Sequence, residues 1–438
     1  MSTSEGNLNE ANGKSRGAAA SLESYDNKPH LVLFSDTFPF GKGEKSFLIP
    51  ELEALSRSFR ITLVTQVSEE LRAEHADVTP LDPSIELVII EPSSTLEYLV
   101  ALPSILTSSL MHKEVRDLVS DGFSFARLLD SVKQYLSAKA FWRACKRRGL
   151  FECSNTALYY SFWFTYRLLS LCMEAQHTPG MRIIGRVNGF DLYNERCLYR
   201  RQPFQRIKRD GCNRVLFGAS TAKEYFTQAF GAEAFYGQYV LNRLGVDGGS
   251  NKNSSVIRDP FLLVSCSNVI PLKHVDLIVE ALRKLSNPDI RWVHFGDGPE
   301  LGYIRGLAEG NGLNCWLPGS VSNDFVLSFY RDNSVGCFIA LSESEGGCPV
   351  SLQEALSFGI PAIVSEAGGA HYEGVDSNGI RLPDNPSVDE VASAIDSMYH
   401  LGDEDWQSMS ARSYELWEQC FDSDACKAEL IHVLNSIL

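Results

Sequence analysis

The residues best placed to do chemistry lie within Ser342–Gly359. The carboxylates of Glu345 and Glu354 flank a turn of small residues, and the apolar run Val335–Leu341 precedes them. This pattern predicts a buried strand, a loop and a helix that opens at Pro349, whose missing N–H costs nothing in a first helical turn. Free backbone N–H groups and the positive end of a helix dipole bind phosphate. Carboxylates accept hydrogen bonds from sugar hydroxyls, so the segment indicates a nucleotide-sugar site.

Composition narrows the class of protein. The chain has 438 residues, enough for two domains or more, and its formal net charge of −15 argues against a nucleic-acid binder. Its 11 cysteines include no Cys-x-x-Cys pair, so we expect reduced thiols in a cytoplasmic protein and neither a disulfide framework nor a zinc site. No apolar run reaches the roughly 18 residues that a membrane-spanning helix needs.

The chain alternates apolar runs with helical segments. Strands are expected at His30–Phe34, Arg60–Gln66, Ala157–Phe162, Arg182–Val187, Phe261–Ser265, Arg291–Phe295, Cys315–Leu317, Val335–Leu341 and Ile360–Val364. The order predicts an α/β fold with doubly wound parallel sheets. We divide the chain into a disordered tail at 1–28, an N-terminal Rossmann-like domain at 29–245, a linker at 246–258, a C-terminal Rossmann-like domain at 259–402 and an amphipathic helical segment at 403–438.

The combined pattern resembles the group 1 (family 4) retaining glycosyltransferases, whose GT-B architecture sets two Rossmann-like domains on either side of a cleft. The resemblance runs from residue 30 to the C-terminus and is strongest over 264–369. The family carries two glutamates with seven residues between them. Here Pro349–Ala355 matches the later part of that motif, which makes Glu354 the second glutamate. The resemblance also implies that the C-terminal helix crosses back to the N-terminal domain.

The first glutamate departs from the family spacing. Its expected position is Gly346, and Glu345 stands one residue earlier, because Gly347 or Cys348 is interpreted as an insertion; Glu343 is the alternative. The resemblance implies that the first glutamate contacts the donor sugar and the second the ribose hydroxyls. It also implies a donor-binding loop made of Gly346, Gly347, Cys348, Pro349, Val350 and Ser351. Without the family, the second glutamate is an acid in an early helical turn, favoured there by the helix dipole.

A second loop, Ser265–Asp276, follows an expected strand. In the family, an arginine and a lysine on this loop neutralise the donor diphosphate. Lys273 matches the lysine, whereas Asn268 takes the place of the arginine. The resemblance therefore implies that Lys273 and backbone N–H groups neutralise the diphosphate, with Asn268 on the same donor-binding loop. A lone lysine at a helix start is otherwise a solvated side chain.

Two further segments match family motifs. Arg186–Tyr193 resembles a strand-end motif in which Asn188 replaces the usual histidine and Asp191 keeps the acid. We count both as candidate catalytic residues, although an Asn-Gly turn is the alternative interpretation. Near the N-terminus, Gly41 and Gly43 belong to a loop after the first strand, where the resemblance implies a close backbone approach to the donor phosphate.

A basic run lies at 196–209, where six cations occur with no acid among them and with Tyr199 and Phe204 between them. Two interpretations stay open. One is a solvated helix face; the other is contact with an anionic lipid surface or a lipid-diphosphate acceptor.

These motifs predict a retaining glycosyltransferase that moves a sugar from a nucleotide-diphosphate donor to a glycan or lipid-linked glycan. By resemblance it serves bacterial surface polysaccharide assembly, with Lys273 and Glu345 at the reacting groups. We expect no cofactor, no metal and no nucleic-acid partner, and a cytoplasmic location with peripheral contact at the inner face of the membrane. Two alternatives remain: a nucleotide-sugar epimerase of GT-B architecture, and a catalytically weak subunit that binds a glycan or a partner.

Overall fold

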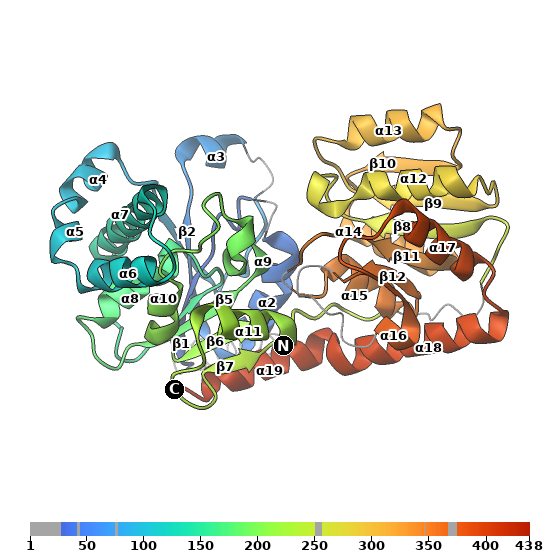
Figure 1. The fold of residues 1–438 in the computed structure, drawn as a ribbon. Coiled ribbons are helices and arrows are strands. Elements are labelled where there is room, and N and C mark those ends of the chain that lie inside the picture. The colour runs from blue at the N-terminus through green and yellow to red at the C-terminus, as the bar shows by residue number, and fades with distance from the viewer. Residues whose placement is uncertain (1–27, 42–43, 75–77, 250–255, 346, 367–374) are drawn as a thin grey trace, which may run out of the picture.

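The chain folds into two α/β units, each built on one parallel sheet (Figure 1). The computed structural model describes residues 28–41, 44–74, 78–249, 256–345, 347–366 and 375–438. The expected tail up to residue 27 and residues 250–255 of the expected linker lie outside these ranges.

The N-terminal unit has a sheet of order β3-β2-β1-β4-β5-β6-β7, in which neighbouring strands are parallel. Its strands are β1 (His30–Phe34), β2 (Arg60–Gln66), β3 (Glu86–Ile90), β4 (Leu158–Ser161), β5 (Arg182–Val187), β6 (Arg214–Phe217) and β7 (Tyr239–Leu241). The central strands are short apolar runs buried along their length, as a parallel sheet covered on both faces requires.

Helices pack around this sheet, and α4 to α7 gather at one side of the unit (Figure 1). The helices are α2 (Lys45–Ser58), α3 (Glu69–Glu74), α4 (Thr95–Ala101), α5 (Ser104–Thr107), α6 (Ser109–Ser120), α7 (Phe125–Arg147), α8 (Tyr166–Ala175), α9 (Gly189–Leu192), α10 (Gln205–Gly211) and α11 (Ser220–Phe230), with the 3-10 turn η1 (Asn194–Arg196). Serine caps the three longest members of the α4–α7 group by accepting a backbone N–H, which fixes where each begins.

The C-terminal unit has a sheet of order β10-β9-β8-β11-β12-β13, again with parallel neighbours. Its strands are β8 (Phe261–Cys266), β9 (Ile290–Phe295), β10 (Cys315–Gly319), β11 (Val335–Ala340), β12 (Ala362–Ser365) and β13 (Gly379–Leu382). Its helices are α12 (Val275–Leu285), α13 (Leu301–Gly310), α14 (Asn323–Asp332), α15 (Val350–Ser357), α16 (Val375–Asn378) and α17 (Val388–Tyr399), with the 3-10 turn η2 (Pro271–Lys273). The two α/β units confirm the predicted fold class.

The C-terminal segment joins the two units. Figure 1 shows α18 (Asp403–Cys420) beneath the C-terminal unit and α19 (Ser423–Asn435) continuing beneath the N-terminal one. Three apolar residues of α19, namely Leu430, Val433 and Leu434, share a core with Leu48, Leu52 and Leu55 of α2. The expectation that the C-terminal helix crosses back is therefore confirmed.

The chain crosses between the units twice, and the two crossings lie side by side. The Val246 N–H donates to the Phe421 carbonyl at 3.0 Å, and the Ser423 N–H donates to the Val246 carbonyl at 3.2 Å. The helical segment breaks at this point, where Asp422 caps α19 by accepting the Ala425 N–H at 2.9 Å. Among the described residues, no helix combines the length and apolar character needed to cross a lipid bilayer.

Candidate functional site

The site begins at the point where the C-terminal sheet reverses its strand order. Strands β8 and β11 are neighbours there, and the strands that follow each of them in the chain lie outward in opposite directions along the sheet. Ligands of open α/β sheets bind beyond the carboxyl ends of the strands at such a point. A pocket occupies that position between the loop after β8 and the loop after β11. Among its lining residues are Ser267, Lys273, Ser342, Glu345, Pro349 and Ser351.

Lys273 and Glu345 meet in this pocket. The Lys273 ammonium forms an ion pair with Glu345 Oε1, and the two side chains are only 18% and 14% exposed. The loops that carry them are also joined through the backbone, because the Glu343 N–H donates to the Leu272 carbonyl at 2.8 Å. Glu345, rather than its alternative Glu343, therefore faces the lysine. Asn268 lies on the same loop as the lysine, and its side chain is exposed.

Glu354 lies on α15 and faces α14 rather than the lysine. Its side chain is nearly buried, and Oε1 accepts a hydrogen bond from Asn323 Nδ2 at 2.6 Å. Burial raises the pKa of the Glu354 carboxyl to about 7, and the Asn323 hydrogen bond opposes this shift. The carboxyl can therefore change its charge near neutral pH, which is a property of ligand-contacting acids more often than of a helix cap.

The predicted donor-binding loop ends as the sequence indicates. Pro349 precedes the first residue of α15, and its carbonyl accepts the Leu352 N–H at 3.0 Å. Gly359 ends the helix with a φ of 69°, a left-handed conformation that favours glycine. Val350 and Ser351 open the helix, and burial raises the pKa of the Cys348 thiol, which makes it a poor nucleophile.

The same loop approaches the N-terminal unit. An ideal β-carbon placed on Gly347 would lie 3.3 Å from the backbone carbon of Gly218, so only a small residue allows this approach without displacement. Gly346 lies outside the described residues. A second contact between the units comes from Arg196 in η1, whose guanidinium donates from Nε to Ser344 Oγ at 2.9 Å and also to the Ser344 carbonyl.

Gly41 and Glu44 shape the loop after β1. A β-carbon on Gly41 would lie 2.0 Å from Thr37 Oγ1, so a larger residue at this position would displace the Thr37 side chain. The buried Glu44 carboxylate accepts backbone N–H groups from Asp36, Thr37 and Phe38 at 2.8–2.9 Å. It also accepts the indole N–H of Trp163 at 2.5 Å. Gly43 lies outside the described residues. This role of Glu44 was not predicted from the sequence, although an acid directly after a glycine turn is a signal that could have suggested it.

Asn188 and Asp191 are joined to each other. Asp191 is buried, and its carboxylate accepts the Asn188 N–H at 2.7 Å and the Phe164 N–H at 2.6 Å. Asn188 Nδ2 donates to the Phe162 carbonyl at 3.0 Å. Burial raises the pKa of Asp191, and burial lowers that of the neighbouring Lys208. These hydrogen bonds hold the loops after β4 and β5 together, which is a positioning role.

The basic run at 196–209 is largely neutralised inside the protein. Arg201 is buried and pairs with Glu114 and Asp121, and Arg206 donates to both carboxylate oxygens of Asp121 at 2.9 Å. Lys208 is also buried, and its ammonium donates to the Phe164 carbonyl at 2.6 Å. Glu114 lies in the middle of α6, and Asp121 is the residue that follows this helix. A solvated basic face is therefore the wrong description for most of this run.

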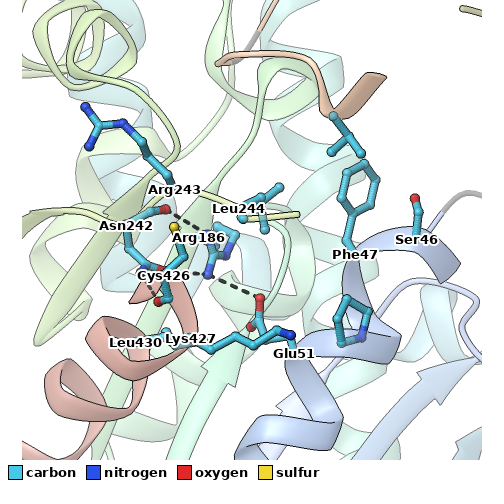
Figure 2. A pocket seen from close by; sticks show the side chains of 13 residues that line it. Ser46, Phe47, Glu51, Arg186, Asn242, Arg243, Leu244, Cys426, Lys427 and Leu430 are labelled. Carbon is cyan, nitrogen blue, oxygen red and sulfur yellow. Dashed lines mark hydrogen bonds and ion pairs between the residues drawn. The ribbon is translucent and has the colours of Figure 1, made fainter. Parts of the chain in front are cut away.

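A buried polar network lies where α2, α19 and the first crossing meet (Figure 2). Arg186 is 1% exposed and donates to Tyr160 Oη at 2.6 Å, to Asn242 Oδ1 at 2.8 Å and to Glu51 Oε2 at 3.3 Å. Asn242 in turn donates to the Cys426 carbonyl of α19 at 3.2 Å. The network fixes the first crossing against the helix that returns to the N-terminal unit.

Metal ligands do not gather in the part of the chain that the structure describes: no group of three or more His, Cys, Asp or Glu is placed to hold an ion. The 11 cysteines are free thiols.

Part of the chain matches a known protein family. Residues 250–415 match the family described as Glycosyl transferases group 1. A curated relative from Salmonella typhimurium, provisionally named colanic acid biosynthesis glycosyltransferase WcaL, is 24% identical over 208 residues. That alignment covers 45% of this chain and 51% of the relative, so the chain spans about half the length of the curated relatives it matches.

Solved structures share the whole architecture. Sucrose-phosphate synthase from Thermosynechococcus elongatus superposes with a TM-score of 0.68 at 12% identity, over 94% of this chain and 99% of that one. Anabaena HepE, solved with UDP and glucose, superposes with a TM-score of 0.62 at 15% identity, over 93% of this chain and 100% of that one. At these identities the likeness shows the fold alone, and that fold is GT-B.

Proposed function

We propose that this protein transfers a sugar from a nucleotide-diphosphate donor to a glycan or lipid-linked glycan, because residues 250–415 match the group 1 glycosyltransferase family. The observation that carries the proposal is the Lys273–Glu345 pair beyond the carboxyl ends of β8 and β11. A cation and a carboxylate on adjacent loops offer one partner for a diphosphate and one for a sugar hydroxyl. The similar structure of Anabaena HepE, which was solved with UDP and glucose, supports a nucleotide sugar as donor.

The transfer proceeds with retention and without a metal. The bond between the sugar C1 and the donor phosphate oxygen breaks, and a bond from C1 to the acceptor oxygen forms on the same face. The acceptor proton passes to the leaving phosphate. Lys273 and the N–H groups at the start of α15 stabilise the charge that develops on the diphosphate, so the chain contributes position and electrostatics rather than a nucleophile.

The donor occupies the C-terminal unit, and the acceptor occupies the N-terminal unit. Glu354 binds the ribose hydroxyls, Glu345 binds the donor sugar, and Gly41 lets the backbone approach the phosphate. Asp191 and Asn188 shape the acceptor side through the loops that they join. The relative named for colanic acid biosynthesis supports a role in assembling a bacterial surface polysaccharide.

The acceptor end of the protein works at an anionic membrane on the cytoplasmic side, where free thiols persist. The surface that supports this contact is α4 and α5 rather than the basic run at 196–209. These helices and the turn between them expose large apolar side chains: Leu96, Leu99, Val100, Leu102 and Leu106. Cations at the end of α7 lie beside them, since Arg147 pairs with Glu97 of α4. Apolar side chains beside cations suit an anionic lipid surface.

A panel of nucleotide sugars tests the function. The purified protein is mixed with UDP-, GDP-, ADP- and dTDP-sugars. Calorimetry measures the thermal stabilisation that each donor gives, and a separate assay measures release of the nucleoside diphosphate. We expect one nucleotide class to bind and to release its diphosphate slowly without acceptor. Conversion of the free donor into its epimer would favour an epimerase, and binding without any release would favour a binding subunit.

A further inference from the structure

The pocket between β8 and β11 contains less positive charge than a diphosphate requires. Among the described residues that line it, Lys273 is the single cation, and Glu345 already engages its ammonium. Asn268 contributes an exposed amide and no charge. A leaving diphosphate develops negative charge on several oxygens at once, and such groups are usually held by more than one positive group. A second cation is therefore expected close to this loop.

Arg196 supplies a cation from the opposite unit. It ends η1 in the N-terminal unit, and its guanidinium reaches across to Ser344 of the loop after β11. Nε donates to Ser344 Oγ at 2.9 Å, and Nη2 donates to the Ser344 carbonyl. The next residue is Glu345, which Lys273 holds from the other side. Two cations from different units thus approach consecutive residues of one loop.

Tyr193 adds a second observation at the same place. Its ring lies under the Arg196 guanidinium at 5.4 Å, and its hydroxyl is buried with no hydrogen-bond partner in the described structure. Burial raises the pKa of Tyr193 to about 12, and the charge of Glu345 adds to this shift. The hydroxyl therefore stays protonated at neutral pH and lies within electrostatic reach of the donor loop. A buried donor without a partner is costly unless a ligand completes it.

We propose that Arg196 is a second diphosphate-binding residue, which exchanges the Ser344 carbonyl for phosphate oxygens when the donor enters. The inference rests on the proposed function, because it assigns the donor of that same site. The exchange is favourable since a guanidinium binds phosphate through charge-assisted bonds, which are stronger than a bond to a neutral carbonyl. It also links the two units through the donor, because the arginine and the loop belong to different units.

The test compares ligands that differ only in phosphate. Isothermal titration gives the Kd of wild type and Arg196→Ala for a nucleoside, its monophosphate and its diphosphate, using the base that the donor panel identifies. We expect the variant to lose affinity for the diphosphate by about 10- to 100-fold, and to bind the nucleoside as wild type does. Arg196→Lys should recover part of the loss. Arg200→Ala, at an exposed position in the same segment, is the matched control and should bind as wild type.

A rescue variant separates phosphate binding from a clasp between the units. Asn268→Arg restores a cation on the opposite side of the pocket, so the double variant with Arg196→Ala should regain diphosphate affinity if both groups serve the same ligand. Equal losses for nucleoside and diphosphate, or no loss for either, would overturn the assignment of Arg196 while the donor site stands. A wild-type protein that binds no nucleoside diphosphate would overturn the proposed function as well.

Discussion

Lys273 and Glu345 form an ion pair in the pocket between the loops after β8 and β11, with less than a fifth of either side chain exposed. The pair neutralises both groups before any ligand is present. Under the proposed function, a donor diphosphate would compete with the Glu345 carboxylate for the Lys273 ammonium, and the released carboxylate would become available to the donor sugar. This exchange would couple binding of the donor diphosphate to formation of the contact between Glu345 and the donor sugar.

Replacing Lys273 and replacing Glu345 should change the affinity for a nucleoside diphosphate in opposite directions. Lys273→Ala removes the cation, and we expect the Kd for the nucleoside diphosphate to rise by about 10- to 100-fold. Glu345→Gln removes the competing charge, so the same Kd should fall severalfold while turnover drops. Titration calorimetry measures both. Lys284→Ala, at an exposed position of α12 where the lysine pairs with Asp389, is the control. Weaker diphosphate binding by Glu345→Gln would contradict the competition.

Glu354 should make ribose binding depend on pH. Its pKa is about 7, so the carboxylate forms as pH rises through neutrality. The ionised carboxylate can accept hydrogen bonds from both ribose hydroxyls, whereas one oxygen of the neutral acid carries a proton. Nucleoside affinity should therefore increase between about pH 6 and 8. Glu354→Gln should abolish that increase. An unchanged pH profile in the variant would leave Glu354 as a helix residue only.

Glu354 should also make the stability of the fold depend on pH, and stability should fall over the pH range in which nucleoside affinity rises. The folded pKa lies above the value of 4.5 that the carboxyl has when solvated, so the native state binds the proton more tightly than the unfolded state. Its stabilising contribution is complete below pH 4.5 and is lost as pH rises through about 7. Urea denaturation should show Glu354→Gln to be less dependent on pH than wild type over that interval. A steeper dependence in the variant would refute this assignment.

Glu44→Gln should destabilise the loop after β1. One amide nitrogen would replace a carboxylate oxygen that accepts backbone N–H groups, which leaves a buried donor facing a donor. We expect a loss of about 1.5–3 kcal/mol in the free energy of unfolding. Glu53→Gln, at an exposed position of α2, the helix that follows the loop, should change this free energy by less than about 0.5 kcal/mol. Similar losses in both variants would argue against the carboxylate as organiser of the loop.

Membrane contact should depend on the apolar side chains of α4 and α5. Changing Leu96, Leu99 and Leu106 together to serine should reduce sedimentation with phosphatidylglycerol vesicles severalfold, because each exposed leucine loses the gain from burial in the lipid interface. Tyr303→Ser, at an exposed position on α13 of the C-terminal unit, is the control. Equal sedimentation of wild type and the triple variant would remove this surface from the account.

Local sequence signals predicted the elements that local physics determines. The strand within Val335–Leu341 and the helix stop at Gly359 were confirmed, because an apolar run and a left-handed glycine act over a few residues. The meeting of Lys273 and Glu345 was also accessible, since loops at the carboxyl ends of adjacent parallel strands share one edge of the sheet.

Contacts between distant segments were not accessible in that way. The acids that neutralise Arg201 and Arg206 are Glu114 and Asp121, 80 or more residues earlier, so a count within the basic run missed them. Arg196 and Ser344 are 148 residues apart and belong to different units. Only the packing of those units brings them together, and no local pattern encodes it.

The most direct test of the account is turnover of the donor with the anomeric carbon observed. The purified protein is incubated with the nucleotide sugar that binds best, and proton NMR follows the free nucleoside diphosphate and the anomeric signal of the first-formed sugar product. We expect the diphosphate to be released in EDTA, the product to appear first with the donor's own anomeric configuration, and Lys273→Ala to slow release at least 10-fold. Release that requires a divalent metal, or a first product of inverted configuration, would contradict the account.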